Sequence, residues 1–326
     1  SGLPFTTRVA DVADLTQFRG LLADTGADAV VSCLPYYLNL PIARIAHAQA
    51  VHYFDLTEDV PTTQGILALA DDARAVLAPQ CGLAPGLIGI VGAHLASRFE
   101  KLRSIKLKVG ALPKHPLGSL GYAFNWSPDG VINEYINDCE VLRGGKKQFI
   151  PALEGAEMVT IDGVTLEAAT TSGGLGTMCD TYAGRCDEVV YKTMRYPGHF
   201  ERMRFLLDDL HLRHDRETLA RVLKNALPPT AEDFVYVHAH VEGWRHGELG
   251  SEQFVRVYSE KPVAGQIWRA ISWTTAAGIC AVVEMVRAGT LPRRGFIRQE
   301  DIPFGPFLAT ESGGLYHEDG VVILRA

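Results

Sequence analysis

The chain has 326 residues, of which 47% are hydrophobic and 21% charged, so it has the composition of a globular protein and the length of two domains. Its formal net charge is −7, with 31 basic against 38 acidic side chains, which argues against a nucleic-acid binder. The six cysteines form no C-x-x-C pair, so neither a zinc site nor a disulfide framework is indicated. We find no signal peptide and no uninterrupted apolar stretch long enough to span a bilayer, and we therefore expect a cytoplasmic protein without membrane partners.

Strand-like and helical patterns alternate over residues 1–98. Helical spacing over residues 15–22 precedes a short apolar run at 29–33, and the same succession recurs at 40–50 and 53–56, then at 62–73 and 75–78. This alternation predicts a parallel sheet with crossover helices.

Functional groups in such sheets gather in the loops after the carboxyl ends of the strands. Here these loops are residues 33–36, 57–59 and 81–86. The last of them contains Gly and Pro and leads directly into an apolar helix over residues 87–95. We expect backbone N–H groups at the start of that helix to face a polar group of a ligand, and a simple strand-to-helix turn is the alternative.

A different pattern follows over residues 99–268. Asp162-Gly163 between two alternating runs predicts a hairpin, and residues 234–241 pair with 253–258 in a second one. Helical segments at 199–210 and 217–227 complete an α+β domain with a largely antiparallel sheet. Over residues 269–326 we expect a long helix at 272–287 and a last strand at 321–324 that return to the first domain.

Three groups of polar residues are candidates for chemistry. Arg195 and His199 stand on either side of a Tyr-Pro-Gly turn, where Arg can bind a carboxylate and His can exchange a proton, although a surface Arg and a capping His are the alternative. Glu58 and Asp59 follow a strand end, where one of them can accept a proton or cap a helix. Ser172 and Gly173 open a Gly-rich run typical of a substrate-facing loop. No metal-binding motif is found.

The sequence resembles the saccharopine dehydrogenase-like family, and within it the lysine 6-dehydrogenase branch. The segments that carry the resemblance are Tyr53-Phe54-Asp55-Leu56, Cys81-Gly82-Leu83-Ala84-Pro85-Gly86, Gly110-Ala111-Leu112-Pro113-Lys114, Trp126-Ser127-Pro128, Glu134-Tyr135, Thr171-Ser172-Gly173-Gly174 and Met194-Arg195-Tyr196-Pro197-Gly198-His199. The family implies a Rossmann-type α/β domain, an inserted α+β domain for substrate and homodimer formation, and a terminal helix that returns to the first domain. It also implies NAD(P)-dependent oxidation at a C–N bond of a small amino-acid substrate.

The resemblance implies roles for single residues. The nicotinamide end of NAD or NADP is expected at Gly82, Leu83, Ala84 and Pro85, its ribose at Cys33, Leu34 and Pro35, and the adenine near Asp11 and Val12 after a first strand. Arg195 is expected to bind a carboxylate and His199, Asp59 or Glu58 to handle the proton, while Tyr122, Trp126, Ser172 and Gly173 form the walls of the substrate site.

The sequence departs from the family pattern at its start. A member begins with a strand, a G-x-G-x-x-G turn, a helix and a second strand with an acidic residue, and none of these is present, so we expect the first βαβ unit to be absent. The favoured activity is oxidative deamination of the lysine ε-amine to the semialdehyde or its cyclic imine. A saccharopine- or polyamine-type dehydrogenase and a non-catalytic binding or scaffold protein are the alternatives.

Overall fold

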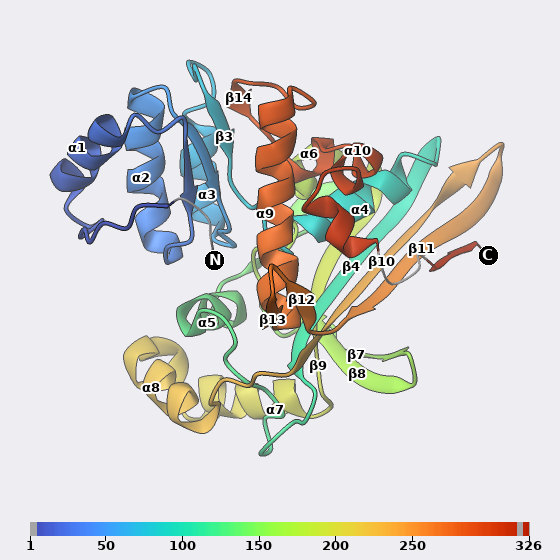
Figure 1. Cartoon of the computed structure of the whole chain (residues 1–326). Coiled ribbons are helices and arrows are strands. Elements are labelled where there is room, and N and C mark those ends of the chain that lie inside the picture. The colour runs from blue at the N-terminus through green and yellow to red at the C-terminus, as the bar shows by residue number, and fades with distance from the viewer. Residues whose placement is uncertain (1–4, 318–321, 326) are drawn as a thin grey trace.

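The computed structural model describes residues 5–317 and the backbone of residues 322–325. Two sheets stand side by side, and the long helix α9 (Ala270–Ala288) lies between the small sheet and the rest of the molecule (Figure 1). The small sheet comes from the first part of the chain apart from one short strand at Gly295–Phe296, and the large sheet comes from the remainder. This arrangement agrees with the expected α/β domain followed by an α+β domain.

The small sheet is parallel throughout and has the order β1-β2-β3-β14. Its strands are β1 (Ala29–Ser32), β2 (His52–Asp55), β3 (Val76–Ala78) and β14 (Gly295–Phe296), and its helices are α1 (Leu15–Thr25), α2 (Tyr36–Ala48) and α3 (Val60–Leu67). Successive side chains of a strand point to opposite faces. Tyr53 and Leu77 accordingly pack with α1, α2 and α3, while Phe54, Val76 and Ala78 join the core that contains α9.

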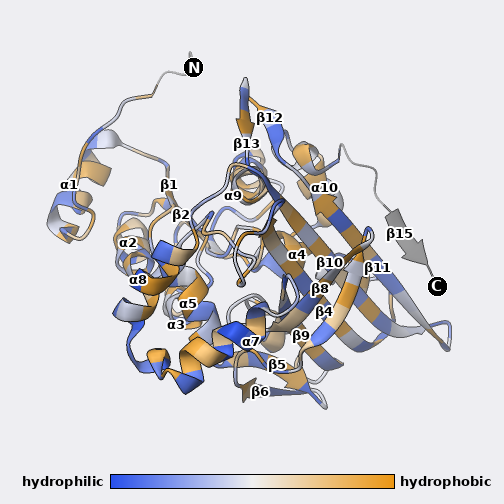
Figure 2. Cartoon of the chain, turned by 90° about the horizontal axis from the view of Figure 1, so that it is seen from below, coloured by the Kyte–Doolittle hydropathy of each residue, from blue (hydrophilic) through white to orange (hydrophobic). Residues whose placement is uncertain are grey.

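The large sheet has the order β15-β11-β10-β4-β9-β5-β6, and β7 and β8 extend it from β9. Only the pairing of β4 with β9 is parallel among its described ladders. The strands are β4 (Lys101–Pro113), β5 (Cys139–Arg143), β6 (Lys146–Ile150), β7 (Glu157–Ile161), β8 (Val164–Thr170), β9 (Cys186–Arg195), β10 (Asp233–Arg245), β11 (Glu248–Tyr258) and β15 (Val322–Arg325). Hydrophobic and hydrophilic residues alternate along these strands (Figure 2).

Shorter elements surround the large sheet. They are α4 (Leu87–Ala96), α5 (Pro128–Ile136), α6 (Met178–Tyr182), α7 (His199–Arg204) with a π-helical turn (Phe205–Asp209), a 3-10 turn (Leu212–His214), α8 (Arg216–Ala226), the hairpin β12 (Lys261–Val263) with β13 (Gln266–Trp268), a 3-10 turn (Gln299–Asp301), α10 (Phe304–Leu308) and a final 3-10 turn (Gly313–Tyr316). Asp162 and Gly163 form the β7–β8 hairpin turn, both with positive φ, as predicted.

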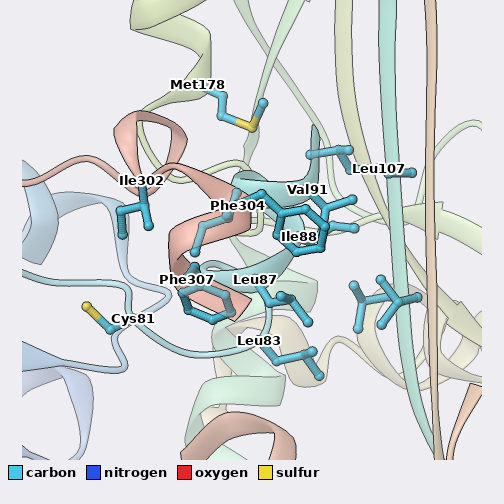
Figure 3. Close-up of a cluster of buried hydrophobic side chains, with 14 of the residues drawn as sticks. Cys81, Leu83, Leu87, Ile88, Val91, Leu107, Met178, Ile302, Phe304 and Phe307 are labelled. Carbon is cyan, nitrogen blue, oxygen red and sulfur yellow. The ribbon is translucent and has the colours of Figure 1, made fainter. Parts of the chain in front are cut away.

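Helix α4 packs against the large sheet, although we assigned it to the first domain. Figure 3 shows Leu87, Ile88 and Val91 of α4 between Leu107 of β4 and the C-terminal residues Ile302, Phe304 and Phe307. The apolar composition of α4 explains this position. Eight of its ten residues are buried, so the helix needs apolar neighbours on all sides. Helix α4 therefore belongs to the core that the two sheets share.

The C-terminal segment divides between the two sheets, which differs from the expectation that it returns to the first domain as a whole. Gly295 and Phe296 join the small sheet beside β3, whereas Val322–Arg325 pair with β11 of the large sheet. Of the expected strand at 321–324, Val321 lies outside the described residues. Helix α9 is longer than predicted and has the length and apolar composition of a membrane span. However, 56% of its apolar 18-residue window is buried inside the fold, as in a core helix.

Candidate functional site

A cavity of about 270 Å³ lies where the carboxyl edge of the small sheet meets the large sheet. Parallel strands place their following loops at one edge, and loops after β1, β2 and β3 all contribute to the wall. The lining residues are Cys33, Leu34, Pro35, Tyr36, Leu56, Thr57, Glu58, Gly82, Leu83, Ala84, Pro85, Val109, Ala111, Trp126, Ser127, Glu134, Tyr191, Thr193, Arg195, Ile271 and Thr275.

Asp55 holds two of these loops together. It is the last residue of β2, and its carboxylate accepts hydrogen bonds from the backbone N–H groups of Thr57 at 2.9 Å and Gln80 at 3.0 Å, and from the Tyr53 hydroxyl at 2.8 Å. Complete burial raises the pKa of Asp55 to about 6, and these three donors oppose that rise. The loop after β2 and the loop after β3 are thereby fixed to one buried group.

The loop of residues 81–86 is closed by its own hydrogen bonds, which corrects one expectation. The first N–H groups of α4, from Leu87 and Ile88, donate to the carbonyls of Gly82 and Leu83, each at 3.0 Å. They are therefore not free to bind a ligand. Gly278 of α9 permits this compact loop to approach the helix, because a Cβ there would lie 2.7 Å from the Gly82 carbonyl oxygen.

The seven residues predicted near the nicotinamide and its ribose all line the cavity: Cys33, Leu34, Pro35, Gly82, Leu83, Ala84 and Pro85. Asp11 and Val12 do not. They lie in a turn before α1, and residues 5–10 form no strand in the part of the chain that the structure describes, contrary to the expectation of a first strand there. Asp11 instead uses its carboxylate to accept a hydrogen bond from Ala13 N–H at 2.9 Å.

Arg195 is 3% exposed and lies at the end of β9. Its Nε donates to the Tyr135 hydroxyl at 2.8 Å, one Nη donates to the Met194 carbonyl at 2.9 Å, and the guanidinium lies 4.5 Å from the centre of the Tyr122 ring. It forms no ion pair with any residue the structure describes. Since a buried cation is costly without a counter-charge, this side chain is suited to bind an anionic group of a ligand.

Alternation along β9 brings Tyr191, Thr193 and Arg195 to the same wall. Their neighbours Val109 and Ala111 on β4 lie on that wall as well, because β4 pairs in register with β9. The sequence analysis identified Arg195 but missed Tyr191 and Thr193. Counting back two positions at a time from Arg195 would have found both.

Two carboxyl groups complete the set of charged side chains in the cavity wall. Glu58 follows β2 and Glu134 belongs to α5, and with Arg195 they are the charged members of the lining. Burial raises the pKa of Glu58 to about 7 and that of Glu134 to about 8, while Arg195 partly lowers the pKa of Glu134. Glu58 was a predicted catalytic residue, whereas Glu134 was named only as part of a segment that carries the family resemblance and was assigned no role.

His199 does not line the cavity. Its Nδ1 lies 2.7 Å from the Leu120 carbonyl, which can only accept, so Nδ1 carries the proton and Nε2 accepts from the Tyr135 hydroxyl at 3.0 Å. Burial and then Arg195 lower the pKa of His199 to about 3. Arg195, Tyr135 and His199 thus form one buried chain of hydrogen bonds, in which a neutral His199 supports Tyr135.

Asp59 also lies outside the wall, because its carboxylate caps α3. It accepts from the Thr62 N–H at 2.9 Å, from the Thr62 hydroxyl at 2.7 Å and from the Asn133 amide at 3.1 Å. These bonds join α3 to α5 and leave the carboxylate occupied.

The four residues expected as substrate walls lie at different depths. Trp126 lines the cavity, and its Nε1 donates to the Tyr122 hydroxyl behind it at 3.0 Å. Ser172 donates its N–H to the Glu134 carbonyl, and Gly173 packs against the Glu58 backbone, where a Cβ would overlap the Glu58 carbonyl oxygen. Tyr122, Ser172 and Gly173 therefore support lining residues from behind.

Comparison with known proteins gives consistent matches along the chain. The family model described as the saccharopine dehydrogenase NADP binding domain matches residues 1–78, and the one described as the saccharopine dehydrogenase C-terminal domain matches residues 82–310. The mitochondrial alpha-aminoadipic semialdehyde synthase of Rattus norvegicus is 28% identical over 125 residues, which are 36% of this chain but only 14% of that protein. The Bos taurus protein of the same name is 26% identical over an equal length with the same coverage.

Two solved structures share the fold. A saccharopine dehydrogenase (L-Glu forming) from Saccharomyces cerevisiae superposes with a TM-score of 0.73 at 18% identity, covering 97% of this chain and 88% of the other. A homospermidine synthase from Legionella pneumophila in complex with NAD has a TM-score of 0.67 at 12% identity and covers 100% and 81%. The boundary between the two family models, after residue 78, agrees with the packing of α4 on the large sheet.

Proposed function

Because the chain belongs to the saccharopine dehydrogenase family, we propose that it is an NAD(P)-dependent oxidoreductase that acts on a C–N bond of an amino acid. The observation that carries the proposal is the cavity itself. It combines the buried guanidinium of Arg195, which suits a carboxylate, with the carboxyl groups of Glu58 and Glu134, which suit amines.

The residues that would hold the cofactor fit the nicotinamide end of a dinucleotide. The walls formed by the loops at residues 33–35 and 82–85 are mainly apolar, and Gly82 faces the cavity without a side chain. When bound there, the nicotinamide supplies the hydride acceptor for the substrate carbon. The protein residues would then orient the C–N bond and exclude bulk water. Nothing in this part of the site favours NAD over NADP.

The charges of the cavity favour lysine among the amino acids. Lysine carries one carboxylate and two ammonium groups, and the cavity wall offers one guanidinium and two carboxyl groups. Saccharopine has additional carboxylates, for which the wall offers no second cation among the described residues. A polyamine has no carboxylate to pair with Arg195, and would leave that cation buried and unpaired. We therefore propose oxidative deamination of the lysine ε-amine to the semialdehyde.

Two measurements test this function. Isothermal titration calorimetry with NAD⁺ and NADP⁺ should give micromolar binding of at least one of them, whereas a non-catalytic scaffold protein would bind neither. Steady-state formation of the reduced nicotinamide should then be compared for L-lysine, saccharopine and spermidine. Turnover with lysine alone supports the proposal. Preferential turnover of saccharopine or spermidine would contradict the lysine assignment, and no turnover of any substrate would contradict the activity.

A further inference from the structure

We propose that the two carboxyl groups of the cavity divide the binding of a diamino acid between them: Glu58 accepts the proton of the reacting ammonium, and Glu134 binds the α-ammonium beside the carboxylate held by Arg195. This inference rests on the proposed function, because it assigns the groups of that substrate to residues. It concerns a catalytic residue and a specificity residue in the same cavity.

Glu58 lines the cavity together with the loops that would hold the cofactor. It is three residues beyond β2, whose final Asp55 also binds Gln80 of the neighbouring loop, and it shares the wall with Gly82 and Leu83. Its Oε1 atom is buried and has no hydrogen-bond partner among the described residues. A carboxyl oxygen in that position requires a donor, and the ammonium of a ligand provides one.

Two glycines hold Glu58 in this position. Gly173 has a φ of +88°, and its missing side chain leaves the space that the Glu58 carbonyl oxygen occupies. Gly130, in the first turn of α5, faces the carboxyl group: a Cβ there would lie 3.2 Å from Oε1 of Glu58. Backbone and carboxyl group are therefore both confined by close contacts, as a proton acceptor with a fixed position requires.

Glu134 interacts electrostatically with both other charged residues of the cavity wall. Arg195 favours its ionised form, and Glu58 acts in the opposite direction. Its backbone is fixed by the N–H of Ser172, which donates to the Glu134 carbonyl at 3.0 Å. Its carboxylate forms no hydrogen bond or ion pair within the part of the chain that the structure describes. Arg195, Glu134 and Glu58 thus offer one partner each for the carboxylate, the α-ammonium and the distal ammonium of lysine.

The protonation behaviour of the two groups supports these roles. Burial raises the pKa of Glu58 to about 7, so that near neutral pH this group exchanges protons readily. Burial raises the pKa of Glu134 to about 8, and a bound ammonium would favour its ionised form. A bound ammonium would add a counter-charge to each of the two carboxylates.

The carboxylate of Glu58 takes one proton from R–CH₂–NH₃⁺ and becomes a carboxylic acid, leaving the free amine. An oxidised nicotinamide dinucleotide held by the loops at residues 33–35 and 82–85 would supply the acceptor for the hydride that leaves the ε-carbon with its electron pair, as the nitrogen lone pair forms the C=N bond. Water adds to the resulting iminium carbon, and loss of NH₄⁺ gives the aldehyde. The proton on Glu58 returns to solvent, so the sum is one amine, one water and one oxidised dinucleotide consumed.

The test compares Glu134→Gln and Glu58→Gln in the full chain with L-lysine and with 6-aminohexanoate, which lacks the α-ammonium. Binding is measured by calorimetry in the presence of saturating dinucleotide and without it. We expect Glu134→Gln to lower the affinity for lysine at least tenfold, while the affinity for 6-aminohexanoate changes less than twofold. Glu58→Gln should lower kcat for lysine about 100-fold and abolish the rise of kcat/KM with pH near neutrality.

Glu201→Gln, an exposed carboxyl on α7, is the matched control and should change none of these values. Thermal unfolding of each variant shows whether it is folded. Glu58→Asp serves as the conservative variant, and we expect it to recover part of the rise of kcat/KM with pH. Equal weakening of both ligands by Glu134→Gln, or an unchanged pH profile in Glu58→Gln, would overturn the inference. If the wild-type protein binds lysine but oxidises no amine, the proposed function fails, and the binding comparison still decides the role of Glu134.

Discussion

The Nε atom of Arg195 donates a 2.8 Å hydrogen bond to the hydroxyl of Tyr135, and this hydroxyl in turn donates to His199. The bond fixes the orientation of a guanidinium that has no carboxylate partner among the residues described. Tyr135→Phe removes the acceptor and leaves a buried Nε–H unpaired. We expect a rise in KM for the amino acid of about tenfold with a smaller change in kcat, measured by steady-state kinetics.

Tyr122→Phe is the matched control for this prediction. It also removes a buried tyrosine hydroxyl, but the hydroxyl that it removes binds Trp126, and the ring that lies against Arg195 is kept. We expect KM to change less than threefold. An equal loss in both variants would show that Tyr135 acts through general packing and not through Arg195.

Stability at high pH provides a second prediction, which concerns Glu134. Its pKa in the folded protein, about 8, is raised above the ordinary glutamate value of 4.5, so the folded state binds more protons than the unfolded state between these values. The free energy of unfolding therefore decreases as pH rises from about 4.5 to about 8. Glu134→Gln removes this loss and should be more stable than wild type at pH 9, by on the order of 5 kcal/mol.

The two proteins should have similar stability at pH 4, where the wild-type carboxyl is neutral in both states. Urea unfolding at the two pH values measures the difference. A Glu134→Gln variant that is less stable than wild type at pH 9 would indicate that the ionised carboxylate is stabilised by Arg195 more than burial penalises it.

The sequence predicts the elements of this fold better than it predicts the neighbours of those elements. Alternating apolar runs identified β2 and β3 and the parallel sheet, because each of these patterns is local. The packing of α4 on the large sheet and the pairing of Val322–Arg325 with β11 depend on contacts between distant segments. No local pattern encodes which of two available sheets such a segment joins.

The same limit applies to the site. The loops at residues 33–35 and 82–85 were identified because strand ends of a parallel sheet are adjacent by geometry. His199 was expected to handle a proton because histidine titrates near neutral pH, but burial beside Arg195 keeps it neutral behind the wall. Glu134 had no distinguishing signal, since a glutamate in a helix is usually exposed and its burial arises from packing.

The neutral state of His199 leads to a third prediction. Its pKa of about 3 in the folded protein lies below the ordinary value of 6.5, so the unfolded state binds more protons between these values and stability falls as pH decreases through this window. We expect the His199 ring signal in NMR spectra to show no titration between pH 5 and pH 8. A midpoint near 6.5 for His199 would contradict its placement.

The fourth prediction concerns the contact between Gly173 and Glu58, and it has a close control within the chain. Gly173 and Gly163 both have positive φ, +88° and +75°, but only at Gly173 would a Cβ meet another atom within 4 Å. Gly163→Ala should cost about 1–2 kcal/mol, the strain of a left-handed alanine. Gly173→Ala adds an overlap with the Glu58 carbonyl oxygen and should lower the free energy of unfolding by more than about 3 kcal/mol. It should also lower kcat, because the backbone of Glu58 must move. Urea unfolding and steady-state kinetics measure the two effects, and equal costs for both alanine variants would show that the loop yields without displacing Glu58.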